Sequence, residues 1–138
     1  MARVIRGRVL VAGDVEGEAL ASTEPLSFWG GYDQTSGEII DRRHPLSGHV
    51  ATGKILALPA SRGSSTTAAV LLEAVRRGTA PAAIITDGAD TFLTLAAIVA
   101  DEMYERTFVV VSVNADDFAT LASAEKLHIG IDGRIDVV

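Results

Sequence analysis

The chain has 138 residues, carries a formal net charge of −6 at pH 7 and contains no cysteine, while 48% of its residues are hydrophobic. This length and apolar content predict a single domain, residues 1–138, with one sizeable core. The acidic balance argues against a nucleic-acid partner and against an anionic membrane surface, since both require a basic face. Without cysteine the chain can form neither a disulfide nor a thiolate metal site.

The beginning of the chain, residues 1–17, does not have the pattern of a secretory signal. Its apolar run is short and interrupted by arginines, and no small-residue cleavage pattern follows. No segment approaches the length of a membrane span. We therefore expect a cytoplasmic protein that does not enter a membrane.

The first third of the chain predicts β structure joined by long loops. Residues 3–13 are rich in β-branched residues without a helical period and predict a strand. Residues 18–23 and 25–31 look like short strands or sheet edges. Residues 33–53 are polar and rich in glycine, with one short strand expected at 38–40. Connections of this length in a compact domain are usually functional or partly disordered.

From residue 54 onward, predicted strands and helices alternate. Apolar runs predict strands at 54–59, 82–87 and 107–113. Helical periodicity predicts helices at 64–77, 91–103 and 115–123. A hairpin over 127–138 follows, with Asp132-Gly133 at its turn. The fold class is therefore α/β: a parallel sheet packed with helices, plus an N-terminal β layer.

Residues 48–54 match the phosphate-loop pattern G-x-x-x-x-G-K. A phosphate loop also requires Ser or Thr as the next residue and a helix that begins there. Here Ile55 follows, and the predicted element is a strand. The match is therefore accidental, and Lys54 is expected to be a solvated residue at the start of a strand.

No other residues form an obvious metal or aromatic site. His44, His49 and His128 do not stand at a recognised ligand spacing, and hydrogen-bonding or surface roles are the better interpretation for His49 and His128. Trp29, beside Phe28, either lines a pocket or packs in the core.

The segment Ser61–Thr67, SRGSSTT, joins the predicted strand to the predicted helix at 64–77. A helix cap needs one hydroxyl, whereas this segment has several. Gly63 allows a ligand to approach the backbone closely, and the helix start favours an anion. Arg62 is suited to bidentate binding of a carboxylate. The residues thus leave two interpretations: a carboxylate or phosphate site, or plain helix capping.

A serine in this segment can also act as a base in its alkoxide form. That role requires nearby N–H groups that strongly stabilise the oxyanion. The sequence offers no obvious histidine partner for a hydrolytic triad. His44 is the candidate, but nothing in the sequence places it near the serines.

Two separated motifs carry a family resemblance. Residues 26–48, LSFWGGYDQTSGEIIDRRHPLSG, and residues 58–67, LPASRGSSTT, resemble the small subunit of the aconitase X family in order and spacing. The similarity covers essentially the whole chain. The Gly-Ser-Ser core also resembles the swivel-domain loop of aconitase and isopropylmalate isomerase.

The resemblance implies a swivelling β/β/α domain that closes over a separate large subunit, with the active site between them. In such enzymes the large subunit carries the iron or iron–sulfur centre, so this chain is expected to bind no cofactor itself. The absence of cysteine agrees with that division.

The aconitase loop implies roles for individual residues. Ser64 matches the catalytic base and Ser65 the second serine, a supporting or alternative base. Aconitases have an arginine where this chain has Thr66, and we infer that Arg62 binds the substrate carboxylate in its place. The expected substrate-binding residues are Arg62, Gly63, Thr66 and His44.

Aconitase X proteins are dehydratases, so the resemblance implies a small hydroxy-carboxylate substrate. Bacterial members are associated with cis-3-hydroxy-L-proline and archaeal members with mevalonate 5-phosphate. We favour hydroxyproline, because the sequence shows no extra basic cluster that would obviously hold a phosphate. Two alternatives are a carboxylate-binding swivel domain without chemistry, and a scaffold whose loop around Trp29 docks a partner.

Overall fold

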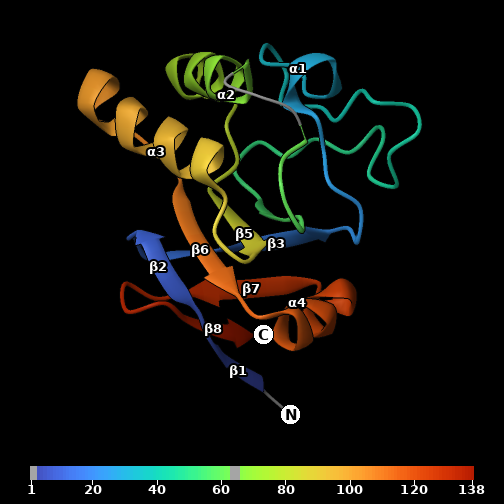
Figure 1. Cartoon of the computed structure of the whole chain (residues 1–138), viewed down its shortest axis with the longest axis vertical. Coiled ribbons are helices and arrows are strands. Elements are labelled where there is room, and N and C mark those ends of the chain that lie inside the picture. Colours follow the sequence, from blue (N-terminus) through green and yellow to red (C-terminus); the bar gives the residue numbers. More distant parts are fainter. Residues whose placement is uncertain (1–2, 63–65) are drawn as a thin grey trace.

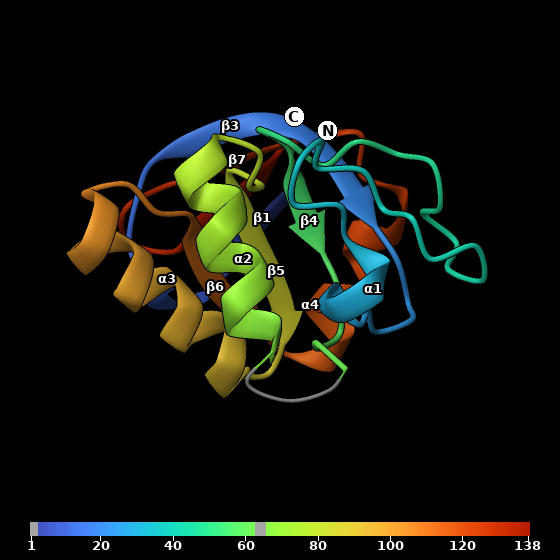
Figure 2. The same ribbon diagram turned by 90° about the horizontal axis from the view of Figure 1, so that it is seen from above.

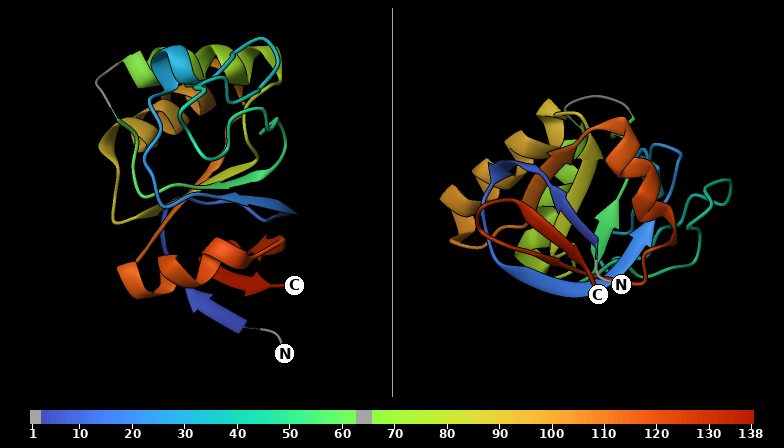
Figure 3. Two further views of the ribbon diagram at one scale, coloured as in Figure 1. Left: turned by 90° about the vertical axis from the view of Figure 1, so that its right-hand side faces the viewer. Right: turned by 90° about the horizontal axis from the view of Figure 1, so that it is seen from below.

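The structure, a computed structural model, describes residues 3–62 and 66–138. It has three layers, with helices over one face of a mostly parallel group of strands and an antiparallel group of strands on the other face (Figures 1 and 3). Helices α2 (Thr66–Arg77) and α3 (Thr91–Tyr104) lie side by side in the helical layer (Figure 2). This β/β/α arrangement confirms the predicted fold class.

Eight strands form one continuous pairing order, β1-β8-β7-β3-β4-β5-β6-β2. Their bounds are β1 (Arg3–Arg6), β2 (Arg8–Val11), β3 (Val15–Ala21), β4 (Ile55–Ala57), β5 (Ala83–Asp87), β6 (Val109–Val113), β7 (Lys126–Ile129) and β8 (Arg134–Val137). Pairing is parallel from β3 through β4 and β5 to β6, and antiparallel elsewhere. The second β layer contains β1, β7 and β8, so the expected N-terminal β layer is completed by the two strands of the C-terminal hairpin.

The strand predicted at 3–13 is divided at Gly7 and serves both β layers. Its first half, β1, pairs with β8, and its second half, β2, pairs with β6. The Gly7 N–H donates to the Gly133 carbonyl at 2.9 Å, and a Cβ at Gly7 would collide with the side chain of Val111. Because β1 and β2 stand at opposite ends of the pairing order, this strand joins the two ends of the curled sheet.

Strands β4, β5 and β6 are buried on both faces and separate two cores. Leu56 and Ile84 belong to the core beneath the helices, together with Leu71 of α2. Ile55 and Ile85 point the other way, into the core between the two β layers. Burial on both faces explains the unbroken apolar runs from which these strands were predicted.

The region 25–40 departs from the prediction. Residues 25–31 contain an irregular turn, α1 (Phe28–Gly31), closed by the Tyr32 N–H on the Phe28 carbonyl, and Leu26 forms only an isolated bridge with Ser61. The strand expected at 38–40 is reduced to isolated bridges that pair Tyr32 with Ile39 and Glu38 with Val50. Phe28 and Ile39 are fully buried, so this segment is held by single buried side chains and not by continuous strand pairing.

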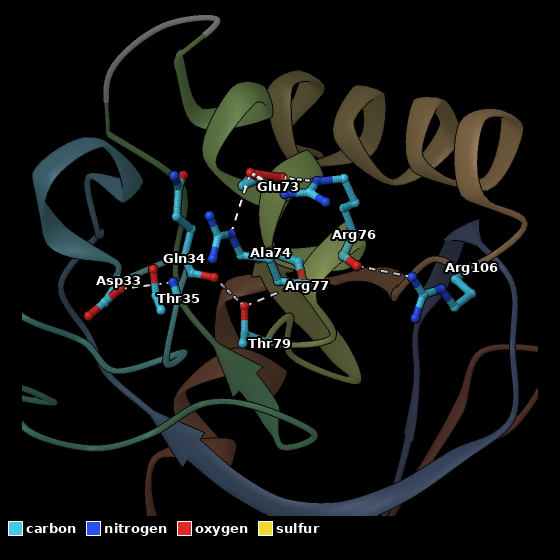
Figure 4. Close-up of polar contacts among 9 residues, drawn as sticks. All are labelled: Asp33, Gln34, Thr35, Glu73, Ala74, Arg76, Arg77, Thr79 and Arg106. Atoms are coloured by element: carbon cyan, nitrogen blue, oxygen red, sulfur yellow. Dashed lines mark hydrogen bonds and ion pairs between the residues drawn. The ribbon is translucent and has the colours of Figure 1, made fainter.

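The long loop that follows α1 is tied to the end of α2 around Thr79 (Figure 4). The Thr79 carbonyl accepts hydrogen bonds from the Tyr32 hydroxyl at 2.7 Å and from Thr52 Oγ1 at 3.1 Å. Thr79 Oγ1 in turn donates to the Gln34 carbonyl at 2.6 Å. Burial raises the pKa of the Tyr32 hydroxyl, which therefore stays a hydrogen-bond donor. These bonds fix the loop against the helical layer.

Two remaining predictions at the C-terminal end are confirmed. Residues 115–123 form α4 (Ala115–Thr120) followed by a 3₁₀ turn, η1 (Leu121–Ser123). Strands β7 and β8 form the expected antiparallel hairpin, with Gly133 at φ 88° in its turn. Asn114 caps α4 by accepting from the Asp117 N–H at 2.8 Å.

Candidate functional site

The candidate site lies beyond the carboxyl end of β4, where the chain continues through residues 58–62 toward α2. The backbone here is held by Leu26, which is fully buried. The Leu26 N–H donates to the Ala60 carbonyl at 3.4 Å, and the Arg62 N–H donates to the Leu26 carbonyl at 2.9 Å. The carboxyl edge of parallel strands is the common place for ligand sites in α/β folds.

Asp90 fixes the same segment from the other side. Its Oδ2 accepts from the Ser61 N–H at 2.7 Å and from Ser61 Oγ at 2.8 Å. Its Oδ1 accepts from the Leu93 N–H at 3.1 Å and thereby caps α3. One carboxylate therefore joins the loop after β4 to the helix after β5. Sequence reasoning missed Asp90, because its bonds to Ser61, 29 positions away in the chain, leave no local signal.

A polar pocket of about 350 Å³ opens beside this segment. It is lined by Glu24, Pro25, Asp41, Arg43, His44 and Arg62. The structure thus brings together two predicted substrate-binding residues, Arg62 and His44, from separate loops. Sequence reasoning missed Glu24, Asp41 and Arg43; the charged run DRRH at 41–44 was a signal for the last two, and Glu24 left none.

His44 is buried and uses both ring nitrogens to hold backbone. Its Nδ1 accepts from the Leu46 N–H at 3.1 Å, so the proton of the neutral ring lies on Nε2, which donates to the Glu24 carbonyl at 3.2 Å. In this arrangement His44 ties the turn at 41–46 to the segment that carries Glu24. Direct contact with a substrate would require one of these bonds to open.

The charged groups of the pocket are not paired with one another. In the part of the chain that the structure describes, neither the Arg43 nor the Arg62 guanidinium has a carboxylate within 4.0 Å, and the Glu24 carboxylate has no cationic partner at that distance. Asp41 is engaged, because its Oδ1 accepts from the Arg43 N–H at 3.0 Å. The arrangement can therefore bind a small charged ligand without first breaking an internal ion pair.

Three of the predicted residues, Gly63, Ser64 and Ser65, lie outside the described residues, so their roles stay predictions. Thr66 is described as the exposed first residue of α2. Its predicted contact with substrate also stays a prediction.

The other sequence predictions are placed as follows. Lys54 stands before a strand, β4, and pairs with Glu18 at 3.3 Å, which confirms that residues 48–54 are not a phosphate loop. His128 makes hydrogen bonds and ion pairs with residues that do not line the candidate site. Trp29 is 68% exposed and therefore does not belong to the core.

The described residues contain no group of three His, Cys, Asp or Glu side chains that could hold a metal ion. None of the helices in the described part of the chain has the length and apolar character needed to cross a bilayer.

Comparison with known proteins places this geometry in a family. The profile of the aconitase X swivel domain matches residues 4–137. The chain belongs to the aconitase X swivel-domain family. A crystal structure of aconitase X from Thermococcus kodakaraensis in its holo form superposes with a TM-score of 0.87 at 31% identity, covering 99% of this chain and 98% of that one.

Two curated relatives represent the two named activities. Cis-3-hydroxy-L-proline dehydratase of Pseudomonas aeruginosa is 44% identical over 99% of this chain, which spans only 23% of that protein. The phosphomevalonate dehydratase small subunit of Pyrococcus furiosus is 34% identical over 97% of this chain and 95% of its own length. The chain thus spans about a quarter of the first relative and nearly all of the second.

Proposed function

We propose that this chain is the swivel-domain subunit of an aconitase X-type dehydratase that acts on cis-3-hydroxy-L-proline. The observation that carries the proposal is the 44% identity, over 99% of this chain, to a protein named for that activity. The polar pocket beside Arg62 supports it, since it offers unpaired guanidinium groups for a carboxylate.

The partner in this proposal is a large aconitase X subunit. This chain corresponds to a quarter of the Pseudomonas enzyme, and the remaining three quarters must be supplied by another polypeptide or another part of a longer one. The chain has no cysteine, and its described residues do not gather as metal ligands. We therefore assign the iron or iron–sulfur centre of the family to the large subunit.

The proposed reaction removes one water molecule from the substrate. A base takes the proton from C2, the C2–H electron pair forms a C2=C3 double bond, and the C3 hydroxyl leaves as water after gaining a proton. The resulting enamine shifts a proton from nitrogen to C3 and becomes Δ1-pyrroline-2-carboxylate. In this chain Ser64 takes the C2 proton, Ser65 supports the alkoxide, and Arg62 binds the carboxylate.

Reconstitution with the large subunit tests this proposal. Ser64→Ala should lower kcat by roughly 10²–10⁴ while complex formation is unchanged. Ser47→Ala is a suitable control, because Ser47 is an exposed serine of the loop at 41–50. The chain alone should not turn over the substrate. Turnover by the isolated chain would reject the shared active site, and an inactive Ser65→Ala with an active Ser64→Ala would reverse the two serine roles.

A second candidate is the phosphomevalonate dehydratase small subunit. It is favoured by one observation, namely that this chain aligns with 95% of the length of the small subunit from Pyrococcus furiosus. Parallel assays of the reconstituted complex with cis-3-hydroxy-L-proline and mevalonate 5-phosphate separate the two candidates. If serine variants and wild type bind a carboxylate equally and none turns over either substrate, the domain is a non-catalytic binding module.

A further inference from the structure

We infer that the pocket at Arg62 recognises a zwitterionic amino acid, with the Glu24 carboxylate holding the substrate ammonium and Arg43 and Arg62 holding its carboxylate. The inference rests on the proposed function for the identity of the substrate, and it adds the residue that distinguishes an amino acid from a simple hydroxy acid.

The charges of the pocket carry this inference. Two arginines, Arg43 and Arg62, line the pocket together with two acidic residues, Glu24 and Asp41. Asp41 is used by its own turn, in which Oδ1 accepts from the Arg43 N–H. The two arginines and the two carboxylates are thus not paired with each other among the described residues, and Glu24 is the carboxylate with no oxygen engaged in a turn.

A ligand with charges of both signs satisfies this arrangement. A carboxylate placed between Arg43 and Arg62 gains charge-assisted hydrogen bonds, and an adjacent ammonium gains one from Glu24. A ligand with a carboxylate and a phosphate would bring its second negative charge toward Glu24. Such like-charge contacts are a common source of specificity.

The backbone around the charged groups is held before any ligand arrives. The Glu24 N–H donates to Ser22 Oγ at 3.0 Å, and the Glu24 carbonyl accepts from the His44 ring at 3.2 Å. Across the pocket, the Arg62 N–H donates to the Leu26 carbonyl at 2.9 Å. Because the backbone positions of Glu24 and Arg62 are fixed, only their side chains must be ordered when a ligand binds, which lowers the entropy cost of binding.

The pocket volume agrees with a small ligand. At about 350 Å³ it lies at the lower end of the range typical of small-molecule sites.

The test uses the reconstituted complex and two ligands that differ only at the ring heteroatom. L-proline carries an ammonium and has no 3-hydroxyl group to eliminate, whereas tetrahydrofuran-2-carboxylate has a neutral ring oxygen in the same place. Their dissociation constants are measured by titration calorimetry with wild type, Glu24→Gln and the control Glu125→Gln. Glu125 is an exposed carboxylate in the segment before β7.

Wild type should bind L-proline at least about tenfold more tightly than the oxygen analogue. Glu24→Gln should abolish that preference and leave the affinity for the analogue unchanged within about twofold, while Glu125→Gln behaves as wild type. Arg43→Gln should weaken both ligands alike, since both carry the carboxylate.

The inference is overturned if wild type shows no preference for L-proline, or if Glu24→Gln keeps the preference or weakens both ligands equally. Turnover is scored separately. A complex that shows the Glu24-dependent preference but does not dehydrate cis-3-hydroxy-L-proline refutes the proposed reaction and leaves the binding site standing. A complex that dehydrates cis-3-hydroxy-L-proline but shows no Glu24-dependent preference refutes the binding inference and leaves the proposed reaction standing.

Discussion

Two hollows of this molecule contain groups of both charges, and they differ in what those charges contact. The hollow near the β7–β8 hairpin, about 450 Å³, is lined among others by Asp14, His128 and Asp136. There His128 Nε2 lies 2.9 Å from Asp14 and its Nδ1 3.8 Å from Asp136. Arg134 pairs with Asp136 at 3.0 Å. In the smaller pocket at Arg62, the guanidinium groups lack such partners among the described residues.

From this difference we expect a ligand in the pocket at Arg62, whose charges are left unpaired by the described part of the fold, and not in the hairpin hollow. The hairpin hollow is larger, yet its charges connect β7 and β8 with each other and with Asp14, the residue before β3, and so have a structural use. The pocket at Arg62 is built from loops whose backbone is fixed by side chains, while the charged ends remain exposed. The first hollow should therefore tolerate substitutions in the assembled enzyme, and the second should not.

The largest effect on stability is expected from the anchor of the pocket loop. Gly37 has φ 80°, and a Cβ there would collide with Thr52 Oγ1 and lie 2.8 Å from the Thr79 carbonyl. Gly37→Ala should lower the free energy of unfolding by about 3 kcal/mol, measured by urea denaturation. Gly48 has φ 87°, and nothing lies within 4 Å of a Cβ built there. Gly48→Ala therefore measures the cost of the backbone angle alone, which is about 1 kcal/mol. Equal losses in the two variants would show that the loop does not depend on this anchor.

A smaller effect is expected from Asp90, which connects the segment at Ser61 to α3. Asp90→Ala removes the helix cap and the two bonds to Ser61, and should lower the free energy of unfolding by about 2 kcal/mol. Asp90→Ser keeps a capping oxygen and should recover about half of that loss. If Asp90→Ser recovers none of the lost stability, Asp90 stabilises the fold through its bonds to Ser61 alone. If Asp90→Ser recovers all of it, the bonds to Ser61 contribute nothing to stability.

The smallest effect is expected in the hairpin hollow and depends on pH. The hydrogen bond to Asp14 raises the pKa of His128 above its unfolded value. A raised pKa stabilises the fold fully below the unfolded pKa of about 6.5, and this contribution is lost as the pH rises through the folded value. The Tm difference between wild type and His128→Gln should therefore shrink from pH 5.5 to pH 8.5. His49→Gln, at an exposed histidine, should show no such trend. A difference that grows with pH would contradict the pairing.

The sequence was sufficient for elements whose signal is local. The strands at 83–87 and 109–113 are buried on both faces and give unbroken apolar runs, and the hairpin turn follows from Asp132-Gly133. The turn at α1 was mistaken for a strand because its packing depends on Phe28 and Tyr32, whose rings lie 5.5 Å apart, and not on periodicity. Propensity and period carry no record of such contacts.

The candidate site was predictable only in part, because long-range contacts assemble it. Arg62 and His44 were identified from their motifs, and both line the pocket. Arg43 was not identified from the sequence. The apparent lack of a second basic group was used to favour hydroxyproline over mevalonate 5-phosphate. That argument does not hold, because the fold places Arg43 in the same pocket as Arg62. The preference now rests on sequence identity to the hydroxyproline enzyme and on the carboxylate of Glu24.

The most direct test compares one arginine from each hollow in the reconstituted complex. Arg62→Gln removes an unpaired guanidinium, and Arg134→Gln removes a paired one. We predict that Arg62→Gln lowers kcat/KM for cis-3-hydroxy-L-proline by at least about tenfold, mainly through KM, since a carboxylate contact acts in both the ground state and the transition state. Arg134→Gln should leave kcat/KM within about twofold of wild type. An unchanged kcat/KM in Arg62→Gln, or equal losses in the two variants, would contradict the assignment of the pocket at Arg62 as the substrate site.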